Sequence, residues 1–168
     1  PNGTLSMYIR IPLAALIGIF FTGLFFLIAI FAPLIAPYGY DEVVSNGFWE
    51  PATSEFLLGT DGIGRDLLSR MIYGLRTTIW IATLATLLSF TTGAVLGFFA
   101  AVVGGWVDQA LSRFVDLLMS IPSLIFALVI LSITPITIGV LIFVMGFLDS
   151  TRVYRLARAV AVDINVMD

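Results

Sequence analysis

Residues 13–34 read LAALIGIFFTGLFFLIAIFAPL, without one charged side chain. A helix that crosses the hydrocarbon core of a bilayer needs about 20 apolar residues, because each residue adds only about 1.5 Å of length. The stretch therefore predicts a membrane-spanning helix over about residues 13–36, ended by Pro33 and Pro37. A cleaved signal peptide is the alternative, but the apolar stretch is longer than a signal-peptide core and no good small-residue cleavage site follows it.

The composition of the whole chain also indicates that it lies in a lipid bilayer. Of the 168 residues, 60 % are hydrophobic and 11 % are charged, and the mean hydropathy is +1.08. Soluble domains have about one quarter charged residues, and a chain this small cannot bury so much apolar surface. We therefore expect an all-α, polytopic transmembrane helical bundle.

Several functional classes are excluded by residues that the sequence lacks. It contains no cysteine and no histidine, and its eight basic residues are all arginine. Disulfides, thiolate metal sites and histidine-based catalytic triads are therefore absent. The net charge of −3 argues against a nucleic-acid surface. We expect no catalytic site, no metal and no cofactor bound by this chain.

Two further uncharged runs, 77–107 and 117–148, are each long enough to cross a bilayer. The second of these has 32 residues, which is too long for one crossing, and a polar stretch with Pro135 interrupts it over residues 132–137. We expect a turn there, with spans at about 77–103, 109–132 and 136–157. Pro122 is expected to kink the third span.

The arginines predict the orientation. Arg10 precedes the first span, and Arg152, Arg155 and Arg158 follow the last one. The positive-inside rule places both groups in the cytoplasm, which requires an even number of crossings. We predict four spans, an ordered extracytoplasmic segment over residues 37–76, and a cytoplasmic region that starts over residues 150–168.

Small residues recur every four positions in the predicted second span. They suit close helix packing in lipid, and a homodimerisation face is the more specific alternative. The packing residues that we single out are Ser89, Gly93, Gly97 and Ala101. In the loop that follows, Arg113 and Asp116 are three residues apart and are expected to form an ion pair.

No ionisable residue lies in the middle of a predicted span, which argues against a proton relay or an ion-coupled carrier. The serines and threonines of the spans would suit a pathway for a polar solute. The alternative is that their hydroxyls bond to the backbone of their own helices.

Residues 58–76 read LGTDGIGRDLLSRMIYGLR. Gly59, Gly62 and Gly64 permit tight backbone turns, and Thr60 or Asp61 can cap a turn. From Asp66 onward, apolar residues recur at helical spacing. The stretch matches neither a phosphate loop nor a calcium loop. We expect a structured outer cap that leads into the second span.

This stretch resembles the signature of one permease subunit of the bacterial dipeptide, oligopeptide and nickel ABC importers. The residues that carry the resemblance are Gly59, Thr60, Asp61, Gly64, Arg65, Asp66, Ser69, Arg70, Tyr73, Gly74 and Arg76. Further similar residues follow in the family's order, in stretches 104–108, 113–116, 122–124 and 149–159. The similarity covers about residues 32–163.

The resemblance implies a multi-pass subunit of the cell inner membrane that forms a heterodimer with a sister permease. Two ABC ATPase subunits, which use ATP and Mg, would lie beneath the pair, and an extracytoplasmic solute-binding protein would deliver peptides to the 59–76 side. ATP-driven closure of the ATPases would turn the pair from inward-facing to outward-facing. Nickel or another small solute is the alternative cargo, and a structural or assembly subunit that transports nothing is the alternative class. Arg152, Arg155 and Arg158 are the candidate residues on the coupling side.

The resemblance also has departures. In this family a coupling loop with a Glu–Ala–Ala core is expected just after Asp168, and the full subunit is expected to have six spans. The sequence also begins with Pro1 rather than methionine. We therefore expect the chain to be part of a longer subunit. The turn around Pro135 lacks the glycines that the family leads us to expect there.

Overall fold

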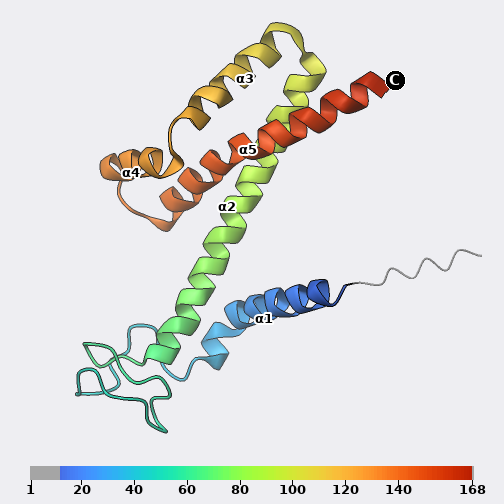
Figure 1. The fold of residues 1–168 in the computed structure, drawn as a ribbon. Helices are drawn as coiled ribbons and strands as arrows, with labels where there is room; N and C mark the ends of the chain where they lie inside the picture. Colours follow the sequence, from blue (N-terminus) through green and yellow to red (C-terminus); the bar gives the residue numbers. More distant parts are fainter. Residues whose placement is uncertain (1–11, 168) are drawn as a thin grey trace, which may run out of the picture. The chain divides into compact units, whose positions relative to one another are not determined.

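The computed structural model describes residues 12–167, with side chains placed as far as Asp163. In chain order it contains α1 (Leu13–Ile35), α2 (Leu67–Val103), α3 (Gly105–Ser120), α4 (Ser123–Ile133) and α5 (Ile138–Met167) (Figure 1). The described residues form no β-strand beyond two isolated bridges, so the predicted all-α class is confirmed. Arg10 and Asp168, which enter the predicted orientation and cytoplasmic region, lie outside the described residues.

The described residues divide into two compact units, with the boundary between Ile79 and Trp80. The first contains α1, the connecting segment 36–66 and the first turns of α2. The second contains the remainder of α2 together with α3, α4 and α5. The two units are described separately below.

Helix α1 corresponds closely to the predicted first span, but Pro33 does not end it. Pro33 lies inside the last turn, and the amide of Ala36 still donates to the carbonyl of Ala32 at 2.9 Å. The helix ends where Ala36 becomes extended, with φ −66° and ψ 127°. A residue that precedes proline avoids the helical region, so Pro37 rather than Pro33 stops the helix.

Two described helices are long and apolar enough to cross a bilayer. They are α1, with 23 residues, and α2, with 37 residues. Helices α3 and α4 would add a third span if they are counted together. Helix α5 is long enough but too highly charged to qualify. Every 18-residue stretch within it includes at least three charged residues, such as Asp149, Arg152 and Arg155. The count of four spans therefore stays a prediction.

The predicted third span, 109–132, is not one helix. It is divided at Ile121–Pro122, and the axes of α3 and α4 differ there by 86°. Ile121 is extended, with φ −90° and ψ 127°, as expected before a proline. Pro122 thus breaks the helix, where the sequence predicted a kink. The turn predicted around Pro135 is confirmed, since α4 ends at Ile133 and α5 begins at Ile138.

In the second unit, α5 crosses α2 and contacts α3 and α4 (Figure 1). The crossing depends on glycines. A Cβ atom added at Gly93 would lie 2.6 Å from the carbonyl oxygen of Ser150, and one at Gly97 would lie 2.7 Å from that of Tyr154. Gly146 has the reciprocal place on α5, where an added Cβ atom would lie 3.0 Å from the carbonyl oxygen of Ala85. Such backbone contact is how helices pack in lipid.

The buried face of α2 follows the small residues Ala85, Ser89, Gly93 and Gly97 and then shifts to Ala100. Ala100 is fully buried, whereas Ala101, the residue we had singled out from the sequence, is only half-buried. The reason is helical geometry. Steps of four residues drift around a helix with 3.6 residues per turn, so one step of three restores the face.

We predict that Gly93→Ala destabilises the protein by about 1–3 kcal/mol, because the added methyl group meets backbone atoms of α5 that cannot rotate away. Gly74→Ala is the matched control in the same helix. No atom lies within 4 Å of its added Cβ, so the better helix propensity of alanine should stabilise it by up to about 1 kcal/mol. The measurement is the thermal unfolding midpoint in detergent by tryptophan fluorescence. Equal midpoints for the two variants would contradict the close approach of α2 and α5.

Candidate functional site

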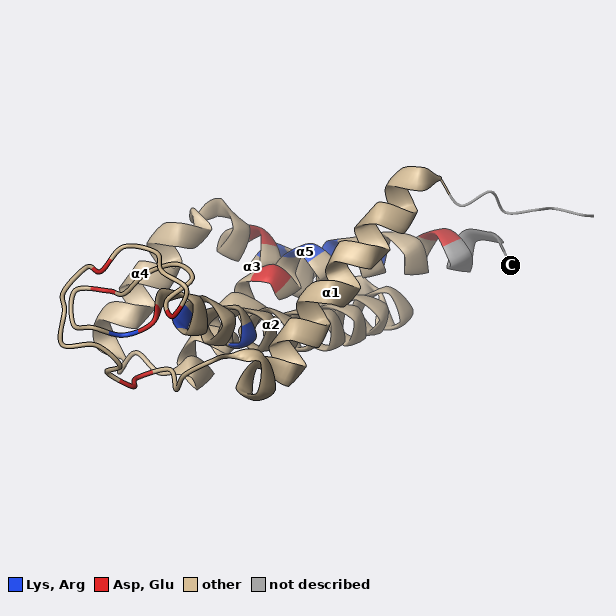
Figure 2. Ribbon diagram, turned by 90° about the horizontal axis from the view of Figure 1, so that it is seen from below, with Lys and Arg blue, Asp and Glu red and all other residues tan. Residues whose placement is uncertain are grey.

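The segment between α1 and α2 folds back on itself and carries a series of acidic residues (Figure 2). The amide of Trp49 donates to the carbonyl of Asp61 at 3.2 Å, and the amide of Thr60 donates to the carbonyl of Glu50 at 3.1 Å. The amide of Val44 donates in the same way to the carbonyl of Gly64 at 2.9 Å. Residues 44–50 therefore lie alongside residues 60–64.

Two of the motif glycines are required by this arrangement. Gly59 and Gly64 have φ values of +78° and +77°, in the left-handed region that favours glycine. A Cβ atom at Gly59 would overlap the carbonyl oxygen of Glu50, and one at Gly64 would overlap that of Ser45. Any other residue at either position would be strained and would push the two halves of the segment apart.

Asp61 joins the segment to the first turns of α2. Its Oδ1 accepts hydrogen bonds from the amides of Ile63 at 2.9 Å and Arg65 at 3.1 Å. Its Oδ2 accepts from Arg65 Nε at 2.8 Å and from Arg70 Nη1 at 2.5 Å. Burial raises the pKa of this carboxyl, but the hydrogen bonds from Arg65 and Ile63 and the charge of Arg65 outweigh it, so the pKa lies well below its ordinary value.

Asp66 and Ser69 begin α2. Asp66 Oδ2 accepts from both the amide and the hydroxyl of Ser69, each at 2.7 Å, which satisfies free donors at the helix N-terminus. The Ser69 hydroxyl in turn accepts from the amide of Tyr38 at 3.1 Å. Both side chains are buried, as is Thr60, whose Oγ1 accepts from the amide of Glu50 at 3.0 Å. These bonds anchor both ends of the segment to α2.

The remaining motif residues lie farther along α2. The Arg70 guanidinium lies over the ring of Tyr40, 5.8 Å from its centroid, and Tyr40 packs edge-on against Tyr73 with centroids 6.2 Å apart. Gly74 is exposed, and Arg76 forms no ion pair with a described residue. The structure therefore brings together the motif residues from Gly59 to Tyr73 but not Gly74 or Arg76.

The cluster is arranged to hold a shape. The oxygens of Asp61 and the Oδ2 of Asp66 already accept hydrogen bonds from protein donors, and no group of metal-ligating residues occurs among the described residues. What the cluster supports is an exposed surface that includes the apolar side chains Phe48, Trp49, Leu57 and Ile63. These apolar side chains are exposed although the polar groups beneath them are paired.

A second polar cluster joins α3 to α5. Asp108 forms a two-point ion pair with Arg158, with Oδ2 2.5 Å from Nη2 and Oδ1 bonded to Nε. The hydroxyls of Ser112 and Tyr154 are 3.1 Å apart. The expected pair between Arg113 and Asp116 does not occur among the ion pairs of the described residues. Asp116 instead borders a pocket together with Arg155 and Arg158 of α5.

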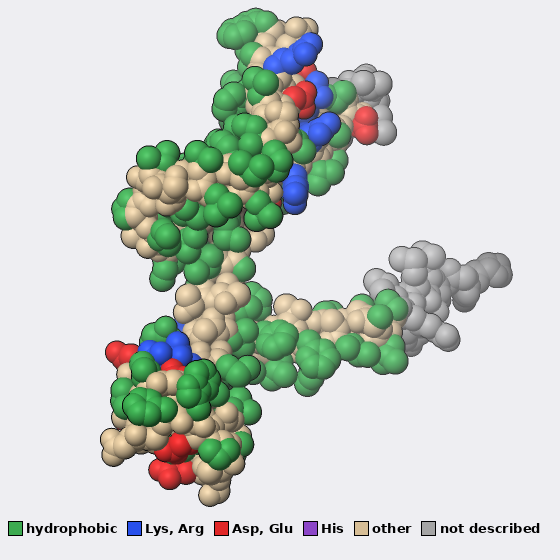
Figure 3. Space-filling model, turned by 60° about the vertical axis from the view of Figure 1, so that its left-hand side comes forward, with side chains coloured by type: hydrophobic (Ala, Val, Ile, Leu, Met, Phe, Trp, Pro, Cys, Tyr) green, Lys and Arg blue, Asp and Glu red, His purple; other side chains and the backbone are tan. Residues whose placement is uncertain are grey.

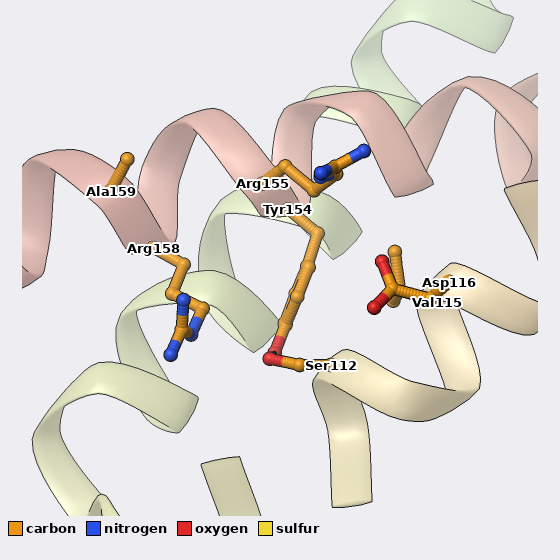
Figure 4. A pocket seen from close by; sticks show the side chains of 7 residues that line it. All are labelled: Ser112, Val115, Asp116, Tyr154, Arg155, Arg158 and Ala159. Atoms are coloured by element: carbon orange, nitrogen blue, oxygen red, sulfur yellow. Dashed lines mark hydrogen bonds between the residues drawn. The ribbon is translucent and has the colours of Figure 1, made fainter. Parts of the chain in front are cut away.

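The predicted coupling-side arginines are placed differently from one another. Arg152 lies 3.7 Å from Asp149 on the exposed side of α5, and Arg158 pairs with Asp108. Arg155 borders a pocket of about 290 Å³, which Asp116 enters from the facing helix (Figure 4). In Figure 3 arginine side chains gather on the unit that contains α5, beside exposed hydrophobic side chains.

Sequence reasoning missed Ser112 and Tyr154. A usable signal was their spacing, since each lies four residues from a charged residue on the same helix face, Ser112 from Asp108 and Tyr154 from Arg158. Several span hydroxyls bond to their own helix: Thr91 to the carbonyl of Leu87 at 2.8 Å and Thr92 to that of Leu88 at 2.6 Å. At these positions the bonds agree with the alternative interpretation, in which the hydroxyls bond to the backbone of their own helix rather than line a pathway for a solute.

Two stretches of the chain match models of known families. Residues 14–51 match the N-terminal TM domain of oligopeptide transport permease C, and residues 93–166 match the binding-protein-dependent transport system inner membrane component. The two matches cover α1 with the start of the connecting segment, and the part of the chain where α2 and α5 cross.

Curated relatives are permeases. The chain is 34 % identical over 158 residues to the dipeptide transport system permease protein DppC of Haemophilus influenzae, covering 90 % of this chain and 54 % of the relative. It is 34 % identical over 119 residues to DppC of Alkalihalophilus pseudofirmus, covering 71 % and 39 % respectively. It is 29 % identical over 144 residues to the oligopeptide transport system permease protein OppC of Bacillus subtilis, covering 84 % and 47 %. The chain thus spans about half the length of the curated relatives that it matches.

We predict that Asp61→Asn loosens the segment 36–66. The change keeps the side-chain size but leaves the guanidinium groups of Arg65 and Arg70 without their carboxylate. Trypsin should then cleave after Arg65 and Arg70 several-fold faster than in the wild type. Asp41→Asn is the control, because Asp41 is exposed and forms none of the ion pairs of the segment. Equal cleavage rates in both variants would show that Asp61 does not hold the segment.

We also predict that the segment loses stability in acid. Because the folded state lowers the pKa of Asp61, the unfolded segment binds the proton at higher pH than the folded one. Asp61 contributes its full stabilisation above about pH 4, the ordinary pKa range of a carboxyl group. This contribution is lost as the pH falls toward the lower pKa that Asp61 has in the folded segment. The measurement is Trp49 fluorescence against pH, with Trp80 and Trp106 replaced by phenylalanine. Asp61→Asn should flatten the profile, and an unchanged profile would contradict the assignment.

Proposed function

Since the chain belongs to the family of binding-protein-dependent transport permeases, we propose that it is the permease subunit of an ATP-driven importer of dipeptides or oligopeptides. The observation that carries the proposal is the similarity over 158 residues to a dipeptide permease. The apolar helices α1 and α2 agree with a multi-pass protein of the inner membrane.

In this proposal the chain supplies the passage and other subunits supply the energy. A sister permease would complete the pathway, and two ABC ATPase subunits would hydrolyse ATP with Mg. A solute-binding protein outside the membrane would deliver the peptide. The chain itself would bind no cofactor and would catalyse no reaction. The family matches support this division of labour, since the second matched family is described as the inner membrane component of such systems.

The proposed topology has four crossings with both ends of the chain in the cytoplasm. Residues 37–76 would then be extracytoplasmic and would form the face presented to the binding protein. Support comes from the internal bonding of this segment, which pairs Asp61 with Arg65 and Arg70 beside the apolar helices and leaves the aromatic side chains of Phe48 and Trp49 exposed. The arginines of α5 would lie on the cytoplasmic side, in agreement with the positive-inside rule.

Deletion of the gene that encodes the chain tests the proposal. Uptake of a radiolabelled dipeptide by the source cells should fall to the level seen when the ATPase genes are deleted, and a plasmid copy should restore it. Uptake of labelled nickel in the same strains is the parallel measurement. Loss of nickel uptake alone would replace peptide with nickel as the cargo, and unchanged uptake of both would favour a structural subunit.

A further inference from the structure

The ion pair between Asp108 and Arg158 connects two helices whose residues are 50 positions apart in the sequence. Its geometry is a fork, in which both carboxylate oxygens meet two different guanidinium nitrogens. Among the ion pairs of the described residues in the second unit, it is the one that joins two helices, since the Arg152–Asp149 pair lies within α5. A two-point pair of this kind restricts orientation as well as distance.

Two further contacts extend this junction along α3 and α5. Ser112, one turn after Asp108, meets the hydroxyl of Tyr154, one turn before Arg158. Farther on, Arg155 Nη1 lies 3.7 Å from Met119 Sδ. From Asp108 to Ser112 on α3 the partner on α5 moves back from Arg158 to Tyr154, so the two helices run antiparallel there with a defined register. Figure 4 shows Ser112 and Tyr154 pointing toward each other across the helices.

The other side of α5 is held in a different way. There α2 contributes Gly97, where an added Cβ atom would lie 3.0 Å from the amide nitrogen of Arg158 and 2.8 Å from the Cβ atom of Ala157. These are contacts of backbone and small groups, with no ion pair between α2 and α5 among the described residues. Smooth contacts of this kind permit small sliding movements, whereas a forked ion pair resists them.

We propose that Asp108 and Arg158 are positioning residues that lock α3 to α5, so that the two helices move as one body during transport. This inference rests on the proposed function. Movement of α5 over the glycine face of α2 would then carry α3 with it and would reach α4 through the break at Ile121–Pro122. The ion pair would therefore stay closed throughout the cycle rather than open as a switch.

A reconstituted transporter measures this role directly. The complete complex, with its binding protein, is placed in liposomes, and both ATP hydrolysis and import of a labelled dipeptide are recorded. Asp108→Asn and Arg158→Gln should each lower the import per ATP hydrolysed by about tenfold, which corresponds to about 1.4 kcal/mol of coupling. The exposed pair gives the control, so Asp149→Asn should leave the ratio unchanged.

Covalent rescue separates a permanent lock from a switch. The double variant Asp108→Cys/Arg158→Cys removes the ion pair, and the chain contains no other cysteine. Its import per ATP should be low, and a short bis-maleimide that joins the two thiols should restore it at least several-fold. Partner subunits without cysteine, and replacement of any cysteine of this subunit outside residues 1–168, confine the reagent to these positions.

Each outcome decides a different question. If the wild-type complex hydrolyses ATP but imports no peptide, the proposed function fails. If the wild type imports peptide and the single variants import as much peptide per ATP hydrolysed as the wild type does, the lock is overturned and the proposed function stands. The same conclusion follows if cross-linking of the double cysteine variant blocks import. Should Asp108→Asn fail to accumulate in membranes, Arg158→Lys replaces it, because lysine keeps the charge but cannot form the fork. An unchanged ratio in that variant would equally overturn the lock.

Discussion

The close approach of α2 and α5 is the constraint on which the second unit depends. Lipid offers no hydrophobic force that would pull apolar helices together, so backbones must come near enough for direct contact. Gly93 and Gly97 make this possible, since a single methyl group at either position would meet atoms of α5. Tyr154, which packs with Ala100 and Val115 in the buried cluster, owes its burial to the same crossing.

The first unit is stabilised differently, by hydrogen bonds and ion pairs, because its connecting segment is rich in polar and charged groups that need partners. There the side chain of Asp61 gathers two backbone amides and two guanidinium groups, and Asp66 satisfies the start of α2. With these donors and acceptors paired, 31 residues between two apolar helices can hold a shape without a strand or a disulfide. Buried polar groups here replace the apolar core that so short a segment cannot build.

Much of the fold could be predicted from patterns that are local in the chain. The first span, the all-α class and the turn at Pro135 depend on uncharged runs and on proline, whose effects reach only a few residues. The end of α1 and the break in the third span were predicted less well. Pro33 fits inside a last helical turn, while Pro122 has an extended residue before it and turns the chain by 86°. The count of four spans stays a prediction, because α5 combines span length with several charges.

The sequence by itself indicated that this chain is a membrane protein and that residues 59–66 form tight turns before a helix begins, because composition and turn-forming residues act locally. The tertiary structure alone decided which groups meet. It paired Asp108 with Arg158, 50 residues away, rather than Arg113 with Asp116, and it buried Ala100 rather than Ala101. Such choices depend on how helices cross and in which register they pack, and no pattern within one helix contains that information.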